Sequence, residues 1–434
     1  MLQVRSGAVD GGGHSPLKGK RIFIPPMAYG SGRTFASAFR ALGLDADITP
    51  PSDHRTRELG ARYTSGDECY PAKVTVGDFM RLLEQPDIDP ASVVLFMPTA
   101  GGPCRFGQYT PLLRSILEKN GYPHTEVIAP SSSDGYADFG DMSRQFVRTG
   151  WRALLAADIL QKVLLQTRPH ECRKGSAEEV YEECLDDVCK TIETASLEPA
   201  AQLRAIREAL ERSRDRFHAL EVRRTKSTPL IGIVGEIFCR LHRFSNEDLV
   251  RRLEEYEAEG WISDITEWVW YTISEQFRNL RLVGRQFSVD AAKAWVRKKV
   301  QKHDEHVLLE PFRDDFVGYE EPGIEEILDA AAPYLPAGGA LGEMVLNIGK
   351  SICLAKRGVD GIIDISPFTC MNGIVCEAIY PRVSRDLGGI PIRNFYFDGT
   401  QSDLDRDLGV YMELARNYQR RKKWQRTYPA TGWV

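Results

Sequence analysis

Short apolar segments alternate with amphipathic segments over much of the chain. The apolar segments are rich in Val and Ile, as in VVLFMP at 93–98 and GIIDIS at 361–366, and such uninterrupted runs are typical of strands buried on both faces. The segments between them repeat apolar residues every three or four positions, which is the spacing of a helix with one buried face. This alternation predicts an α/β fold with parallel sheets.

Two regions carry this alternation, and we expect each to form one domain. The first covers residues 19–150, and its predicted elements are strand 21–27, helix 33–42, strand 45–50, helix 73–85, strand 93–98, helix 108–120 and strand 125–131. The second covers residues 229–434 and opens at PLIGIVGEIF with the strand LIGIVG, 230–235. Its further predicted elements are helix 246–259, helix 340–357, strand 361–366, helix 374–386, strand 392–398 and a terminal helix.

The remaining segments have a different character. Residues 1–18 are rich in Gly and Ser and are predicted to be a disordered tail. Residues 151–228 join LLAADILQKVLLQ to a highly charged stretch with apolar residues at helical spacing, which predicts a helical connector. A Trp-rich helical insertion is expected at about 261–335, inside the second domain.

Composition narrows the class of protein. A chain of 434 residues is long enough for two or three domains. Its net charge of −5 argues against nucleic-acid binding, and we interpret its one concentrated basic run, RRKKWQR at 420–426, as a solvated helix end. No stretch approaches the roughly 20 apolar residues of a membrane helix. Nine cysteines, an odd number, with no apolar signal region indicate a cytoplasmic protein with reduced thiols.

Three cysteines occupy the same kind of position, after a strand or loop and directly before a helical pattern. They are Cys69 in SGDECYPAK, Cys104 in TAGGPCRFGQY and Cys370 in SPFTCMNGIV. Open α/β sheets bind ligands at the edge where strands end and helices begin. The positive end of a helix also favours thiolate over thiol. If the two sheet edges face each other, the three thiolates form one metal site in the cleft between the domains.

The ligand type favours iron and sulfide over zinc. No C-x-x-C pair is present and no His lies near these thiols, which argues against a zinc ribbon or finger. Three thiolates from separate loops suit a [4Fe–4S] cluster whose fourth iron has no protein ligand. Zinc binding remains open, and so does a metal-free scaffold in which these cysteines are packed.

Other residues are candidates for the same site. Glu236 follows a predicted strand, and burial in a cleft would suit it to proton transfer, although a structural carboxylate explains it equally well. Asp67, Glu68 and Arg105 flank the cysteines and could bond cluster sulfur or a substrate carboxylate, or could form salt bridges that shape the loops.

A further set of cysteines leaves a second cluster type open. Cys239, Cys353 and Cys376 lie in or beside the second α/β region, and together with the first three they would supply six thiolates to a double-cubane [8Fe–9S] cluster. The favoured interpretation is that they are packed in the core.

Four segments resemble the 2-hydroxyacyl-CoA dehydratase component family, above all its activase-related branch, which is similar also to double-cubane cluster proteins. The segments are SGDECYPAKVTVGDFMRLLE, FMPTAGGPCRFGQY, GEIFCRLHRFSNEDLVRRLEEYEAEGW and GIIDISPFTCMNGIVCEAIYPRVSR. The resemblance implies two flavodoxin-like or Rossmann-like domains that hold a [4Fe–4S] cluster through three cysteines, and Cys69, Cys104 and Cys370 are the matching residues.

The resemblance also implies a function and partners. In this family a separate ATP-hydrolysing activase delivers one electron at low potential, and the cluster then drives a difficult reduction or a dehydration. We therefore expect a low-potential reductase or a dehydratase-like component, sensitive to oxygen and suited to an anaerobic host. A homodimer, or a heterodimer with a related subunit, is expected. The alternative is an electron-relay or accessory iron–sulfur module that never contacts substrate.

Overall fold

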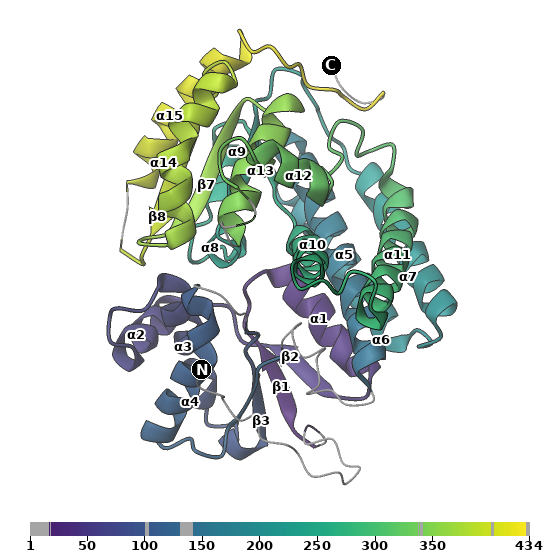
Figure 1. Ribbon diagram of the computed structural model, residues 1–434, viewed down its shortest axis with the longest axis vertical. Helices are drawn as coiled ribbons and strands as arrows, with labels where there is room; N and C mark the ends of the chain where they lie inside the picture. The colour runs from purple at the N-terminus through teal and green to yellow at the C-terminus, as the bar shows by residue number, and fades with distance from the viewer. Residues whose placement is uncertain are drawn as a thin grey trace.

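The computed structural model contains two parallel four-stranded sheets with helices around them. It describes residues 17, 19–99, 104–130, 142–336, 338, 342–400 and 403–430. Figure 1 shows the first sheet at the bottom and the second at the top, with a group of helices along one side. The α/β class with parallel sheets, predicted from the alternation of segments, is confirmed.

The first sheet has the strand order β2-β1-β3-β4, with all neighbours parallel. Its strands are β1 (Arg21–Ile24), β2 (Asp45–Ile48), β3 (Val93–Phe96) and β4 (Glu126–Ile128). The helices between them are α1 (Tyr29–Ala41), α2 (His54–Tyr63), α3 (Tyr70–Leu83) and α4 (Tyr109–Lys119). This is a doubly wound order, in which ligands bind outside the carboxyl ends of the strands.

Helix α2 is not predicted by the sequence pattern, because its residues HRTRELGARY are mostly polar or charged. It begins at a capping box, in which Asp53 accepts a hydrogen bond from the Thr56 amide at 3.0 Å and the Thr56 hydroxyl accepts one from the Asp53 amide. It crosses α3 very closely, since a Cβ at Gly77 would overlap the carbonyl oxygen of Thr56. This contact fixes α3 and with it the residue before its first turn, Cys69.

The second sheet has the order β6-β5-β7-β8 and is also fully parallel. Its strands are β5 (Leu230–Gly235), β6 (Glu259–Ile262), β7 (Gly361–Pro367) and β8 (Ile392–Phe397). The associated helices are α8 (Ile237–Leu241), α9 (Leu249–Glu255), α13 (Glu343–Lys356), α14 (Met371–Asp386) and α15 (Leu404–Gln419).

Strand β6 corrects the sequence interpretation, which placed its residues at the end of a helix and the start of the insertion. The helix ends earlier, at Glu255, and the strand begins with a charged residue, Glu259, that hides its apolar pattern. Glu259 is fully buried, and its carboxylate accepts hydrogen bonds from Arg426, at 2.7 Å, and from the Tyr319 hydroxyl. A partner from far along the chain therefore makes this buried strand possible.

Three long helices follow the first sheet: α5 (Ser143–Thr167), α6 (Ser176–Thr194) and α7 (Pro199–His218). Helix α5 runs without interruption across residue 150, where the sequence placed a domain boundary. It packs against α1 on one side and against β6, α10 (Ile265–Leu282) and α11 (Val289–Leu309) on the other. Helix α12 (Ile324–Ala331) lies against α13.

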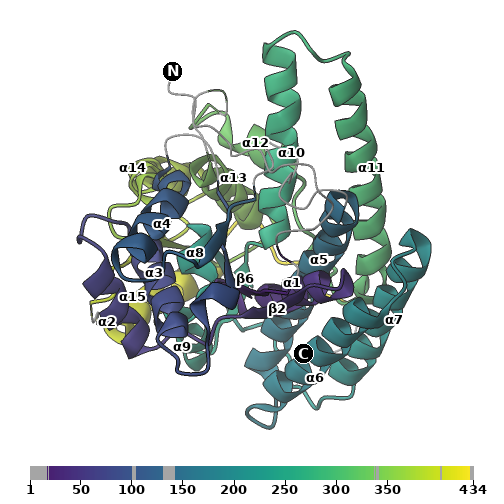
Figure 2. The ribbon, with the colours of Figure 1, turned by 90° about the horizontal axis from the view of Figure 1, so that it is seen from below.

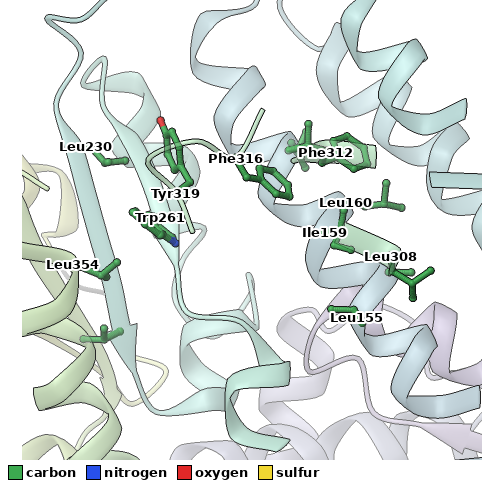
Figure 3. Close-up of a cluster of buried hydrophobic side chains, with 14 of the residues drawn as sticks. Leu155, Ile159, Leu160, Leu230, Trp261, Leu308, Phe312, Phe316, Tyr319 and Leu354 are labelled. Carbon is green, nitrogen blue, oxygen red and sulfur yellow. The ribbon is translucent and has the colours of Figure 1, made fainter. Parts of the chain in front are cut away.

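The largest apolar core joins these helices to the second sheet. Figure 3 shows residues of α5 beside residues of the insertion, with β5, β6 and α13 nearby; the labelled side chains are Leu155, Ile159, Leu160, Leu230, Trp261, Leu308, Phe312, Phe316, Tyr319 and Leu354. Of the predicted disordered tail, residues 1–16 and 18 lie outside the described part, and Leu17 is buried. Among the described helices, none is long and apolar enough to cross a membrane.

Candidate functional site

The three cysteines singled out by the sequence each stand directly before a helix. Cys69 precedes α3, Cys104 precedes a short 3₁₀ helix, Arg105–Gln108, and Cys370 precedes α14. Their backbones are nearly identical, with φ of −67°, −67° and −68° and ψ of 152°, 133° and 127°. None of the three side chains caps its own helix, although the Cys69 sulfur shares a hydrogen bond with the Tyr109 hydroxyl.

One arginine joins the loops that carry these cysteines. Arg105, the residue after Cys104, donates from Nη1 to the carbonyl oxygen of Asp67 at 2.8 Å. Its Nη2 lies 3.5 Å from the hydroxyl oxygen of Thr369, the residue before Cys370. The guanidinium therefore reaches from the first α/β region into the second and links the loops that carry Cys69 and Cys370.

The backbone before Cys370 is in an unusual conformation. Thr369 has a φ of 65°, in the left-handed region that β-branched residues rarely adopt. Such a conformation costs on the order of 1–3 kcal/mol and persists only where the surroundings impose it. Here it lies in the short turn between β7 and α14, directly before Cys370, and its hydroxyl faces Arg105.

The thiols are partly shielded from water and surrounded by carboxylates. Burial, together with the nearby carboxylate of Glu236, raises the pKa of the Cys370 thiol to about 12. Burial also raises the pKa of Cys69, against a hydrogen bond that its sulfur shares with the Tyr109 hydroxyl. Burial and the charges of Glu343 and Glu236 do the same for Cys104. These thiols are therefore neutral at physiological pH unless a cation joins them.

Two carboxyl groups lie beside the thiols, the half-buried Glu236 and the buried Glu343. Glu236 directly follows β5 and caps α8, accepting hydrogen bonds from the amides of Phe238 and Cys239 at 3.0 and 2.8 Å. Burial raises its pKa, although those two bonds oppose the shift. The structure thus places Glu236 near the cysteines, and much of its carboxylate is engaged in capping.

Glu343, the first residue of α13, is the functional candidate that sequence reasoning missed. Its carboxylate accepts hydrogen bonds from the Ile237 amide at 2.7 Å and from Nδ2 of Asn372 at 3.1 Å. Burial and the charge of Glu236 raise the pKa of Glu343 to about 8. No local motif marks this residue, because only the pairing of β5 with β7 brings the start of α13 beside Cys370. At neutral pH the two acids together retain a proton.

The other residues that flank the cysteines have different roles. Glu68 accepts hydrogen bonds from the amides of Ser65 and Gly66 at 3.0 Å, so it shapes the loop before Cys69. Asp67 contributes its carbonyl oxygen to Arg105. The described His, Cys, Asp and Glu side chains include no group of three arranged to hold a single metal ion.

The three additional cysteines are all buried. Cys239, in α8, is near enough to Cys69 and Cys370 for their charges to interact. Cys353 lies on α13, and its thiol faces the carbonyl oxygen of Glu326 at 3.9 Å. Cys376 lies on α14, and its thiol faces a carbonyl oxygen of α13 at 3.5 Å. Of these three, Cys239 and Cys376 are both near enough to Cys370 for their charges to interact, and Cys353 shows no such interaction.

A polar network outside the cysteine loops also joins the two α/β regions. Ser52 donates to the buried carboxylate of Asp78 at 2.8 Å and lies 3.1 Å from Nε2 of His242. The other ring nitrogen of His242 lies 2.7 Å from the Ser245 hydroxyl. Arg57 donates to the carbonyl oxygen of Gly399 at 2.7 Å. These contacts keep α3 and its preceding cysteine close to the second sheet.

Comparison with known proteins gives no relative. A scan against models of protein families finds no match to this chain, and a search of curated proteins also finds none.

Proposed function

We propose that this chain is an iron–sulfur protein of the 2-hydroxyacyl-CoA dehydratase component type. It binds a [4Fe–4S] cluster through Cys69, Cys104 and Cys370 and acts as a low-potential reductase or dehydratase after ATP-driven activation by a partner. The observation that carries the proposal is the position of Arg105, whose guanidinium reaches the backbone of the Cys69 loop and the side chain before Cys370.

The donor set is compatible with such a cluster. Soft thiolate ligands from three separated loops suit iron and sulfide. The amide oxygen of Asn372, two residues after Cys370, is buried and has no hydrogen-bond partner among the described residues; as an acceptor, it calls for a hydrogen-bond donor such as a substrate hydroxyl or a water. A bound cluster would supply one-electron transfer and, at an iron without a protein ligand, Lewis acidity.

The protein side chains supply proton handling and charge around it. Glu343 holds a proton near neutral pH, and its environment suits a general acid that protonates a leaving hydroxyl or a reduced carbon. Arg105 presents its guanidinium at the exposed side of the site, where it can orient an anionic group of a substrate. Glu236 caps α8 and so fixes the turn after β5. Its carboxylate interacts with Glu343, and the negative charge that these two acids share lies close to the thiols.

An electron-relay function is the second candidate. Apolar side chains are exposed around Cys370, with Phe368, Met371 and Ile374 being 59%, 39% and 52% exposed. An apolar rim is suited to a docking protein, and a relay needs only that contact and the cluster.

Metal content after anaerobic purification tests the proposal. We expect about four irons and four sulfides per chain, bleaching in air, and loss of most iron in the Cys104→Ser variant. Cys172 is also exposed but lies outside the site, so Cys172→Ser is the matched control and should keep its iron. About eight irons would favour the double cubane, whereas zinc alone, or no metal after reconstitution, would refute the iron–sulfur proposal.

The role of the partner needs a separate measurement. The iron-loaded chain is mixed with an ATP-hydrolysing activase and a low-potential reductant. We expect ATP-dependent reduction of the cluster, which spectroscopy can monitor. Turnover of 2-hydroxyacyl-CoA substrates would then favour the dehydratase over the relay. Reduction without turnover of any acyl thioester would favour the relay.

A further inference from the structure

Two helices of the insertion form a hairpin that extends beyond the rest of the molecule. They are α10 and α11, and Figure 2 shows their shared end projecting away from both sheets. Along α11, one face is buried, with Ala291, Ala294 and Leu308 directed toward the neighbouring helices α5, α7 and α10. A helix that served only this packing would show polar residues on its other face.

The other face of α11 is instead apolar in a regular pattern. Val289, Val296 and Val300 are 70%, 54% and 37% exposed. With Lys293 they follow the spacing four, three, four, which is the narrow a/d seam of a coiled coil. The exposed seam from 289 to 300 is about 17 Å long, which matches three turns of a partner helix. A single Lys at such a seam position is a known means of fixing register.

The charge of the hairpin indicates what kind of helix fits. The whole hairpin, residues 265–309, carries eight Lys and Arg and five Asp and Glu, a net charge of +3. Four of its five acidic residues lie outside 276–303, so the projecting part is the more basic one. Arg297 and Lys299 stand at the positions that flank the seam. Among the described residues, Lys293 and Lys299 form no ion pair with a carboxylate, although the Lys299 ammonium lies over the Trp295 ring. These cations are available to an acidic partner.

We propose that the outer face of α11 docks an amphipathic helix of another protein, with an apolar seam flanked by Asp and Glu. A symmetric contact between two copies would place the basic residues beside one seam against those of the other, which is repulsive. The hairpin also exposes Leu282, Val283 and Phe287 near its projecting end and Trp295 on α11, all of which suit a lipid surface, but only the seam of α11 has the regular a/d spacing of a helical partner. The observations therefore favour a protein helix, and the inference does not depend on the proposed iron–sulfur function.

Designed peptides test the chemistry of the partner. Two labelled helical peptides of three heptads share a Leu and Val seam, and one has Glu and the other Lys at the flanking positions. In fluorescence anisotropy with the full chain, the Glu peptide should bind at least about tenfold more tightly. The double variant Val296→Asp/Val300→Asp should weaken that binding by about tenfold or more. Val410, on α15, is equally exposed at 54%, so Val410→Asp is the matched control and should bind as the parent does.

A charge variant keeps the test decisive if the double Asp variant does not fold. Arg297→Glu/Lys299→Glu should reverse the preference, so that the Lys peptide binds more tightly. Equal binding of the two peptides, or no binding up to about 1 mM, would overturn the proposal. So would binding to phosphatidylserine vesicles in place of the Glu peptide, or a dimer in sedimentation velocity that dissociates when Val296 and Val300 are replaced by Asp.

Discussion

Replacing Lys350 by Met should lower the free energy of unfolding by about 3–5 kcal/mol. Lys350 lies on α13, two turns after Glu343, and its side chain is only 1% exposed. Its ammonium lies 2.7 Å from the carboxylate of Glu267 and also bonds that of Glu321. Burial by itself would lower the pKa of Lys350, but these two carboxylates outweigh it and raise that pKa. The lysine is therefore charged in the folded protein.

The cost arises mainly at Glu267. Glu321 keeps a second cation, Lys162, at 2.5 Å and accepts a hydrogen bond from the Trp261 indole at 2.7 Å, so it remains paired in the variant. Glu267 has a side-chain exposure of 9%, and Lys350 is its ionic partner. Met keeps the unbranched stem of Lys, so the substitution removes the charge with little change in packing. A buried carboxylate without a partner accounts for the predicted loss.

Urea unfolding measured by circular dichroism checks this prediction, with a second substitution as rescue. The double variant Lys350→Met/Glu267→Met removes both charges and should recover all but about 1–2 kcal/mol. Lys302 forms a 2.7 Å ion pair with Glu305 but is 71% exposed, so Lys302→Met should cost at most about 1 kcal/mol. A loss below about 1 kcal/mol for Lys350→Met, or a double variant no more stable than the single one, would refute the reasoning.

Three further predictions concern the site and its support. Arg105→Ala should reduce the iron bound after anaerobic reconstitution while changing the free energy of unfolding by less than about 1 kcal/mol, because Arg105 is exposed; unchanged iron would contradict its bridging role. Burial raises the pKa of Asp78 to about 7, above its unfolded value, so the native state binds more protons and stability should fall on the order of 2–4 kcal/mol as pH rises from 4 to 7. Asp78→Asn should flatten that part of the pH profile, and an equally steep fall would exclude this carboxyl as its source. Gly77→Ala should destabilise the α2–α3 crossing by about 1–3 kcal/mol, measured by thermal unfolding against Gly409→Ala, a control in helix α15 where the added Cβ would make only ordinary contacts.

The sequence predicted the parts of the fold that depend on local pattern. Alternating apolar strands and amphipathic helices are visible along the chain, and the parallel sheets follow from them. Strand β6 was not predicted because it begins with a charged residue, Glu259. Burial of that carboxylate is possible only because Arg426, near the far end of the chain, donates a hydrogen bond to it. The same contact corrects the interpretation of the basic run at 420–426, since Lys422 also forms a buried ion pair, with Asp360 at 2.7 Å.

Some residues of the candidate site could likewise be predicted from the sequence, and others could not. Cys69, Cys104 and Cys370 could be singled out because each stands before a helix in the linear pattern. Glu343 could not, because its proximity to Cys370 depends on strand order and on the path of α13. The reach of Arg105 across to Thr369 is likewise a tertiary contact between residues 264 positions apart. Sequence patterns therefore predict which residues are available, and only the packing of the two sheets predicts which of them meet.

The continuity of α5 has a consequence for how this protein can be divided or inherited. A single helix of 25 residues contributes Phe146 to the core of the first sheet and Leu160 to the core shared with the second. A truncation at residue 150 would separate residues 143–150 of that helix from residues 151–167 and would expose buried side chains such as Leu155 on the second fragment. Neither fragment of the protein is therefore expected to fold alone. Recombination that exchanges one sheet between related genes must keep α5 together with the helices and strands that pack against it on both sides.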